Sequence, residues 1–265
     1  MGYYNSFPIS FFSRAIQSGY TTRTMAFSTA TGIVDTPTLD LLNTMDLSLI
    51  STGVDTKMIA LYPLVGGASG PTSYNFMNTA THQIGWFNNM TFTSTYVKSG
   101  PSSGYGDTGI IPSASMLLNS SHISVYSYND IGDATGGDIG AVDNSINGRI
   151  EMWLHSFGNT YISNSTVAVN PPGGAYVSTI GYFINNRVQS SEFTITHNGT
   201  LKTTMATNSA SLCPYPISIC SVFVNGTERF YASQRQIGFA TIGNGLTNQN
   251  IIDLSNIVST FIAGK

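Results

Sequence analysis

The one concentration of acidic residues lies between residues 130 and 143, where aspartates stand among glycines. Carboxylate oxygens are the ligands that Ca²⁺ prefers, so this segment could hold a calcium ion as a cofactor. The alternative, which we favour, is a surface loop between two strands in which Asp and Gly serve the geometry of turns. The candidate calcium ligands are Asp130, Asp133, Asp138 and Asp143.

Aromatic side chains are the second candidate for chemistry, because an exposed ring can stack on the apolar face of a sugar. The alternative is that these rings pack in a core, as most tryptophans of sandwich folds do. The candidates for glycan contact are Trp86, Tyr105, Tyr128 and Tyr161, and Trp153 belongs to the same class.

Catalysis is not indicated. A glycosidase needs two carboxyl groups that face each other across the scissile bond. Here the 13 acidic residues are spread thinly over 265 positions, and Glu151 is the single carboxylate of the predicted strand 149–154, with Glu192 and Glu228 in separate segments. The four histidines are far apart in the sequence, so a metal-binding histidine cluster is not expected. We therefore predict no enzymatic activity and no catalytic residues, with a glycoside hydrolase as the least favoured function.

Composition limits the partners. Charged residues make up only 9 % of the chain, where an ordinary soluble domain carries about 25 %. The net charge is −3 and the ten Lys and Arg residues are scattered singly, which argues strongly against nucleic acid as a partner. Weak net charge also gives little protection from self-association, so we expect a subunit of an assembly.

The sequence gives no sign of membrane insertion or export. No apolar run reaches the length of a membrane span, and residues 1–20 lack the basic start of a signal peptide. The chain is therefore expected to be made in the cytoplasm. Cys213 and Cys220 have no second pair for zinc, so we expect small buried hydrophobes, with a local disulfide as the alternative.

Residues 1–34 are predicted to form a segment distinct from the rest of the chain. Its first part is too aromatic to be disordered by composition and too short to fold alone. It could add a strand to its own domain, or it could be an arm for attachment and oligomerisation that docks on a neighbouring subunit. The residues of this arm are Tyr3, Tyr4, Phe7, Ile9, Phe11 and Phe12.

Two helices are predicted, one after this segment and one at the end of the sequence. The first opens at Asp35-Thr-Pro-Thr, with Thr36 as the candidate cap, and ends before Gly53. The second is capped by Thr247, with Asn250 three residues on, and stops at Gly264. Both carry an apolar stripe that should dock on a core: Leu39, Leu42, Met45 and Leu49 in the first, and Ile251, Leu254, Val258 and Phe261 in the second.

From Lys57 onward the pattern is one of short strands. Residues 58–65 form an apolar run typical of a strand buried on both faces, and Asn198-Gly199 is the clearest two-residue hairpin. These features indicate a single all-β domain of the jelly-roll type with a helix at each end. Further strands are expected at 122–128, 149–154, 160–163, 177–183, 193–197, 201–204 and 217–224.

Four stretches resemble the concanavalin A-like, or laminin G-like, structural proteins of tailed bacteriophages. They are Ala30–Asp35 with Lys57–Gly67, Tyr105–Pro112, Leu118–Tyr126 and Phe239–Phe261. The resemblance covers roughly residues 30–265, and its motifs are specific as an ordered set but weak singly. It implies a concanavalin A-like antiparallel jelly-roll sandwich over residues 35–265.

The resemblance also implies a function. Proteins of this family occur on the virion as head fibres, decoration proteins or tail-fibre components. We therefore expect a non-enzymatic virion structural protein that forms homo-oligomers, trimers included, and binds capsid or tail proteins. Contact with host surface glycans is an additional expectation, and the alternative is a tail-fibre receptor-binding or carbohydrate-binding module.

Overall fold

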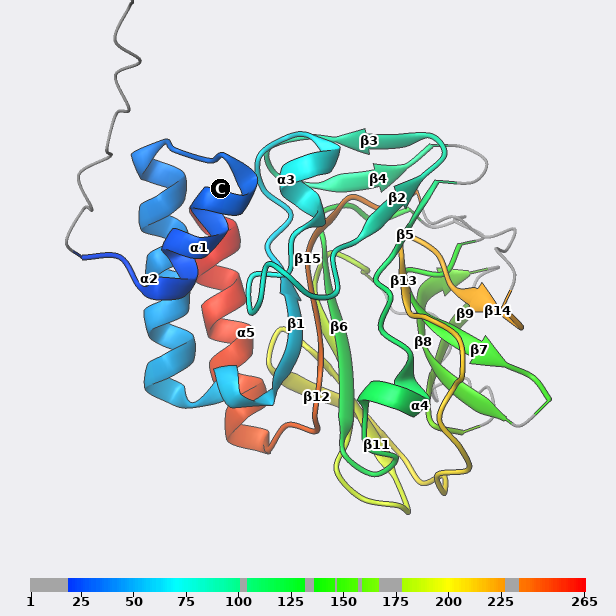
Figure 1. Ribbon diagram of the computed structural model, residues 1–265. Helices are drawn as coiled ribbons and strands as arrows, with labels where there is room; N and C mark the ends of the chain where they lie inside the picture. Colours follow the sequence, from blue (N-terminus) through cyan, green and yellow to red (C-terminus); the bar gives the residue numbers. More distant parts are fainter. Residues whose placement is uncertain are drawn as a thin grey trace, which may run out of the picture.

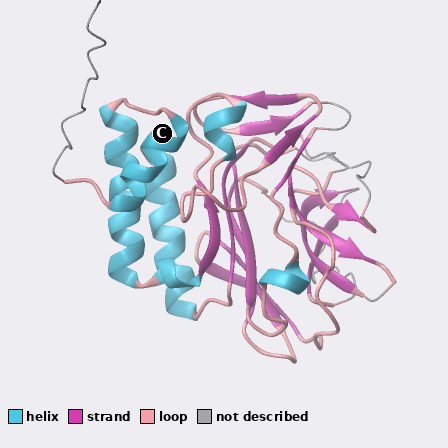
Figure 2. Cartoon of the chain, viewed as in Figure 1, coloured by secondary structure: helices cyan, strands magenta, loops and turns pink. Residues whose placement is uncertain are grey.

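The computed structural model describes residues 19–100, 104–131, 136–145, 147–156, 159–166, 178–226 and 234–265. Two sheets, antiparallel except for one short parallel pairing, pack face to face, and helices cover the outer face of one of them (Figures 1 and 2). The predicted all-β sandwich with helices near both ends is confirmed. The arm residues between Tyr3 and Phe12 lie outside the described part of the chain.

The first sheet, sheet A, is built around the long neighbouring strands β6 and β15. Strand β15 pairs with β1 on its other side and, at one residue pair, with β4. The order across sheet A is β12 (Thr200–Met205), β11 (Phe193–His197), β10 (Gly181–Arg187), β6 (Ser121–Ser127), β15 (Ile237–Gly243), and then β1 (Met58–Tyr62) or β4 (Val97–Ser99) with β3 (Met90–Phe92).

The second sheet, sheet B, lies opposite sheet A. Its order is β2 (Gly85–Phe87), β5 (Tyr105–Asp107), β13 (Ser218–Ile219), β7 (Ile139–Asp143), β8 (Gly148–Ser156) and β9 (Asn159–Asn164), and β14 (Phe223–Val224) lies parallel to β7. Apolar side chains from both sheets form the sandwich core, which includes Ile123, Val125, Met152 and Phe183.

The helices of the sheet A side form a layer of their own. They are α1 (Thr22–Thr31), α2 (Thr36–Thr52) and α5 (Asn248–Ala263), and we call them the helix layer; η1 (Val54–Lys57), α3 (Ser69–Ser73) and α4 (Pro112–Ser115) are short connectors. Both predicted stripes are buried, and they pack on Leu61, Tyr182 and Phe239 of sheet A. No described helix has the length and apolarity that a membrane crossing requires.

The caps agree with the sequence in one helix and differ in the other. Thr247 and Asn250 form the expected capping box at α5. At α2 the cap is Asp35 and not Thr36, because the Asp35 carboxylate accepts the backbone N–H of Thr38 at 3.0 Å. Hydrogen bonds from the Thr38 side chain and from its backbone N–H lower the pKa of Asp35.

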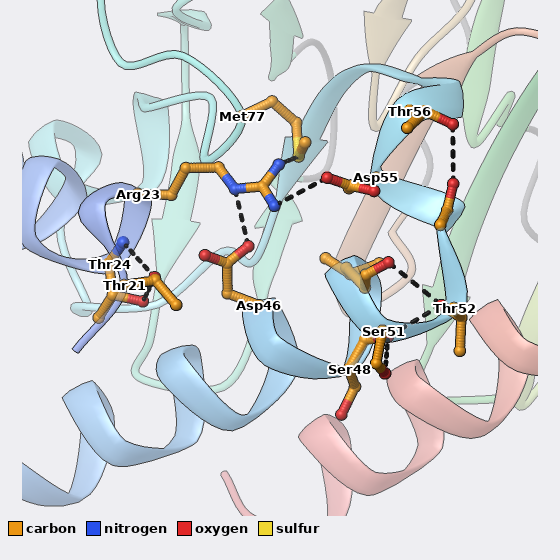
Figure 3. A network of polar contacts seen from close by, with 12 residues as sticks. Thr21, Arg23, Thr24, Asp46, Ser48, Ser51, Thr52, Asp55, Thr56 and Met77 are labelled. Atoms are coloured by element: carbon orange, nitrogen blue, oxygen red, sulfur yellow. Dashed lines mark hydrogen bonds and ion pairs between the residues drawn. The ribbon is translucent and has the colours of Figure 1, made fainter. Parts of the chain in front are cut away.

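Helix α1 is an element that the sequence did not reveal. Its Phe27 is fully buried against Phe76, and its Arg23 pairs with Asp46 of α2 at 2.8 Å and with Asp55 of η1 at 3.1 Å (Figure 3). Helix α1, inside the predicted segment 1–34, therefore packs against α2, η1 and Phe76.

Several strands also differ in extent from their predicted ranges. The run 217–224 is split into two short strands, because Cys220 takes a left-handed backbone conformation with φ 63°. Strand β10 begins only at Gly181 and continues to Arg187. The hairpin at Asn198-Gly199 is confirmed: both residues have positive φ, as a type I′ turn requires. Cys213 and Cys220 are free and buried.

The outer edge of β1 is covered by one side chain. The Asn75 amide accepts the N–H of Leu61 at 3.1 Å and donates to the carbonyl of Ile59 at 3.2 Å, and the N–H of Phe76 binds the carbonyl of Leu61. These groups occupy positions that a further strand would otherwise use.

Candidate functional site

Two of the predicted calcium ligands, Asp138 and Asp143, bind other groups of the protein. Asp138 pairs with Arg235 at 2.9 Å, both side chains being fully buried, and its second oxygen accepts the N–H of Leu154 at 2.8 Å. Asp143 accepts the backbone N–H and the hydroxyl of Ser145 in the turn after β7.

Asp130 accepts the hydroxyl of Thr179 at 2.8 Å. Across the described residues, no three His, Cys, Asp or Glu side chains come together in a way that could hold a metal ion. Asp133 lies outside those residues, so calcium binding through it stays a prediction. The expectation of a loop over 130–143 is wrong in its second half, because Ile139–Asp143 is the buried strand β7.

The predicted glycan contacts are not gathered at one surface. Trp86 pairs with Gly106 and Phe87 with Tyr105, so Trp86 and Tyr105 lie on opposite faces of sheet B. Tyr105 is only 7 % exposed, stacked on Phe87 at 4.8 Å between ring centroids, so it belongs to the core. The prediction of an exposed stacking ring is wrong for Tyr105.

Trp86 and Tyr128 are partly exposed, but both pack against their own domain. The Trp86 ring covers Gly106 and meets Phe92 edge-on at 5.4 Å. The Tyr128 ring covers Gly238, and burial raises its pKa to about 12. The side chain of Tyr161 lies outside the described part of the chain.

The structure instead presents a row of functional groups on β8. Ile150, Met152 and Leu154 point into the sandwich core, so Arg149, Glu151 and Trp153 point to the outer face of sheet B. We call these three residues the β8 row. The sequence predicts this strand and includes Trp153 among the candidate aromatics, but it does not group Trp153 with Arg149 and Glu151, although alternation alone places the three side chains together.

Glu151 organises the β8 row. One carboxylate oxygen accepts the Arg149 guanidinium at 3.0 Å and the other accepts the Trp153 indole N–H at 2.7 Å. Glu151 is only 2 % exposed, whereas Arg149 and Trp153 are partly exposed. Arg149 also donates to the side chain of Asn144. The indole and the guanidinium are thus held in fixed directions at the surface.

The strand beside Glu151 leaves room for this arrangement. Gly140 of β7 pairs with Glu151, and a Cβ at position 140 would stand 2.5 Å from the Glu151 Cα atom. With φ at 145°, this position also has a backbone conformation that favours glycine. A flat aromatic ring next to fixed charged donors and acceptors can bind a polyhydroxylated ligand by stacking and hydrogen bonding.

A sequence motif typical of serine nucleophiles lies between two strands, and not between the strand and the helix that its chemistry requires. Gly100-Pro-Ser-Ser-Gly104 has the spacing of a serine nucleophile elbow, which requires a strand followed by a helix. Here the motif connects β4 to the strand β5, and residues 101–103 lie outside the described ranges. It therefore does not add a catalytic candidate.

Known proteins share the fold of this chain and not its sequence. No protein-family model matches, and no curated protein is similar. Among solved structures, domain 4 of AbnA, a GH43 extracellular arabinanase from Geobacillus stearothermophilus, in complex with arabinotriose, is similar with a TM-score of 0.54 and 14 % identity. The match covers 75 % of this chain and 98 % of that domain.

Two further structures are similar over smaller shares of their own length. The botulinum neurotoxin serotype D binding domain has a TM-score of 0.50 and 12 % identity, over 76 % of this chain and 52 % of that one. A Trypanosoma rangeli sialidase has a TM-score of 0.51 and 8 % identity, over 82 % of this chain and 39 % of that one. At these identities the similarity shows the fold alone, and that fold is a lectin-like jelly-roll sandwich.

Proposed function

We propose that this chain is a non-enzymatic structural protein of a tailed-phage virion, displayed on the particle as a head fibre or decoration protein, which contacts host surface glycans. The observation that carries the glycan contact is the β8 row, where a nearly buried carboxylate holds an indole and a guanidinium on the outer face of sheet B. The described helices α1, α2 and α5 pack on sheet A, on its side away from sheet B (Figure 1).

Carbohydrate as the ligand class has support from the fold. The arabinanase domain with a similar sandwich was solved with arabinotriose, and the jelly-roll sandwich leaves one sheet face available for such a ligand. The virion role rests on the resemblance of the ordered sequence stretches to phage structural proteins.

The absence of catalysis is supported by the state of Glu151. Both of its oxygens accept hydrogen bonds, so the carboxylate acts as a scaffold for Arg149 and Trp153. Glu192 precedes β11 of sheet A, so these two carboxylates belong to different sheets and do not form the facing pair that glycoside hydrolysis needs. Release of reducing sugar from a host polysaccharide that Glu151→Gln abolishes would overturn this part of the proposal.

Binding to glycans is tested with the full chain on a glycan array. Trp153→Ala should remove the signal, because stacking supplies much of the contact. Phe87→Ala is the matched control: Phe87 is another exposed aromatic of sheet B, 45 % exposed, but stacks on Tyr105 away from the row. Equal binding by both variants and the wild type would contradict glycan contact through the β8 row.

The virion role is tested separately. Mass spectrometry and cryo-EM of purified particles should find the chain on the head or tail surface. A chain that begins at Gly19 should keep its melting temperature but lose particle binding or trimer formation, because the removed residues contain the aromatic arm and leave α1 intact. Assembly as efficient as that of the full chain would show that the arm is not the attachment element.

A further inference from the structure

A groove lies between the β11–β12 hairpin and the first turns of α5, at the end of sheet A that the helix layer leaves partly open. Its volume is about 360 Å³, within the range of small-molecule sites. The hairpin contributes Thr194, Thr196 and Leu201, and α5 contributes Asn248 and Ile252. Glu192, just before β11, completes one end of the lining.

The groove holds a polar group that the fold does not satisfy. Thr196 is 3 % exposed, and its hydroxyl has no hydrogen-bond partner. Ser255 of α5, 5 % exposed, also has an unpartnered hydroxyl, and it lies beside Gly199 of the groove lining. Buried hydroxyl groups without partners are uncommon, because each has given up its hydrogen bonds to water.

The lining selects the charge of a ligand. Glu192 is the charged residue of the groove, and the carbonyl of Glu192 is fixed by the Arg187 guanidinium at 3.1 Å. A negative ligand would be repelled by this carboxylate. The N-terminus of α5 offers an anion little, because Thr247 and Asn250 already satisfy each other in the capping box.

Two aliphatic side chains of the lining are well exposed. Leu201 is 57 % exposed and Ile252 is 44 % exposed, which is unusual for side chains of this size. A ligand without negative charge fits this lining, with hydroxyl groups toward Thr196 and Glu192 and C–H groups toward the aliphatic side chains. A pyranose ring has this combination of faces.

We propose that this groove is a second carbohydrate site, which binds a neutral sugar residue by hydrogen bonds to Thr196 and Glu192. It goes beyond the proposed function, which assigns glycan contact to the β8 row on the other sheet. The two sites lie on different sheets, so either can fail in experiment without the other.

The test uses the full chain and saturation-transfer NMR with glucose, galactose, mannose and N-acetylglucosamine as probes, and inorganic phosphate as the anionic probe. We expect at least one of the sugars to bind and phosphate not to bind. Thr196→Val keeps the shape of the side chain and Glu192→Gln keeps its size, and each should weaken sugar binding by about tenfold or more.

The melting temperature of the Thr196→Val variant distinguishes a role of Thr196 in ligand binding from a role in folding. Thr196→Val should leave the melting temperature unchanged or raise it, because it replaces an unpartnered hydroxyl with a methyl group. Thr203→Val, on the same hairpin but outside the groove lining, is the matched control and should bind sugar as the wild type does. Trp153→Ala should likewise leave sugar binding at the groove unchanged.

Three results would overturn the proposal: no saturation transfer to any of the four sugars, binding of phosphate in their place, or sugar binding that Thr196→Val leaves intact. If Trp153→Ala removes all sugar binding while Thr196→Val does not, the β8 row alone binds carbohydrate and the groove does not.

Discussion

The sandwich core and the helix layer share sheet A but draw their side chains from different parts of the chain. The core takes side chains from strands spread over residues 60–242, whereas the helix layer takes most of its side chains from segments near the two ends. The ion pairs differ as well: Arg235 and Asp138 are both fully buried at the sandwich, while Arg23 of the helix layer is 23 % exposed. Both regions have apolar cores, but the charged pair of the sandwich is fully withdrawn from water whereas that of the helix layer is not.

Asp138→Ala should have the largest effect. It removes the carboxylate that pairs with Arg235 and accepts from Leu154, so the free energy of unfolding should fall by about 3–5 kcal/mol in chemical denaturation. Asp130→Ala, at an exposed aspartate that accepts a 2.8 Å hydrogen bond from the Thr179 hydroxyl, is the control and should cost less than about 1 kcal/mol. Equal losses would show that burial of the pair does not matter.

Phe261→Ala tests the apolar side of the comparison. Phe261 is 1 % exposed and meets Phe239 of sheet A at 5.5 Å, so truncation should cost roughly 3–5 kcal/mol. We expect the lower end of that range. Phe261 lines a groove between α2 and α5, so the two helices can move together and fill part of the space that the ring leaves. Ile50→Ala, 48 % exposed on α2, should cost far less. A melting temperature that Phe261→Ala leaves unchanged would mean that α5 is peripheral.

His122 makes the stability of the boundary between the layers depend on pH. Burial lowers its pKa to about 4, although the hydrogen bond to the carbonyl of Asn244 at 2.6 Å opposes the shift. The unfolded chain takes up a proton near pH 6.5 and the folded chain does not, so stability falls as the pH drops from 6.5 toward 4, by up to about 3 kcal/mol.

The measurement is the free energy of unfolding between pH 7 and pH 4 for the wild type and His122→Gln. The difference between the two proteins should shrink as the pH falls, because only the wild type carries the cost of keeping His122 neutral. A constant difference across this range would contradict a neutral buried histidine.

Arg23→Met should have the smallest effect. It removes a partner of the buried Asp46 carboxylate, but because Arg23 is itself 23 % exposed, water can take its place, so we expect a loss of roughly 1–2 kcal/mol in thermal unfolding. Asp55→Asn, at the partly exposed second partner of Arg23, should change stability by less than about 1 kcal/mol. A loss as large as that of Asp138→Ala would mean that the ion pair of the helix layer stabilises the protein as much as the buried pair of the sandwich does.

The sequence predicts more features of the helix layer than of the sandwich. The stripes of α2 and α5, the capping box and the turn at Asn198-Gly199 are local patterns, and all of them are present. Helix α1 was missed because its sequence is rich in Thr and Ser and has a weak apolar stripe. Strands β2 to β5 have three residues each, too few to show an alternating pattern.

The site residues were harder to predict because they depend on pairings distant in sequence. Asp138 looked like a calcium ligand because Arg235, almost a hundred positions later, cannot be recognised as its partner from spacing. Tyr105 is a reasonable stacking candidate from the sequence alone. Phe87 and Phe223 contact its ring only once sheet B has formed, and the sequence does not show this. The β8 row needed only strand alternation, whereas the position of Thr196 beside α5 required the fold.

The amide of Asn75 has a consequence for how copies of this chain can meet. Of the strands that end sheet A in the described structure, β1 has its free groups occupied by Asn75 and Phe76, and β3 is only three residues long. Strand β12, six residues and mostly exposed, keeps an open edge. Pairing of sheet A edge to edge with another chain is therefore directional, and Lys202 on β12 places a positive charge where such a partner would have to approach.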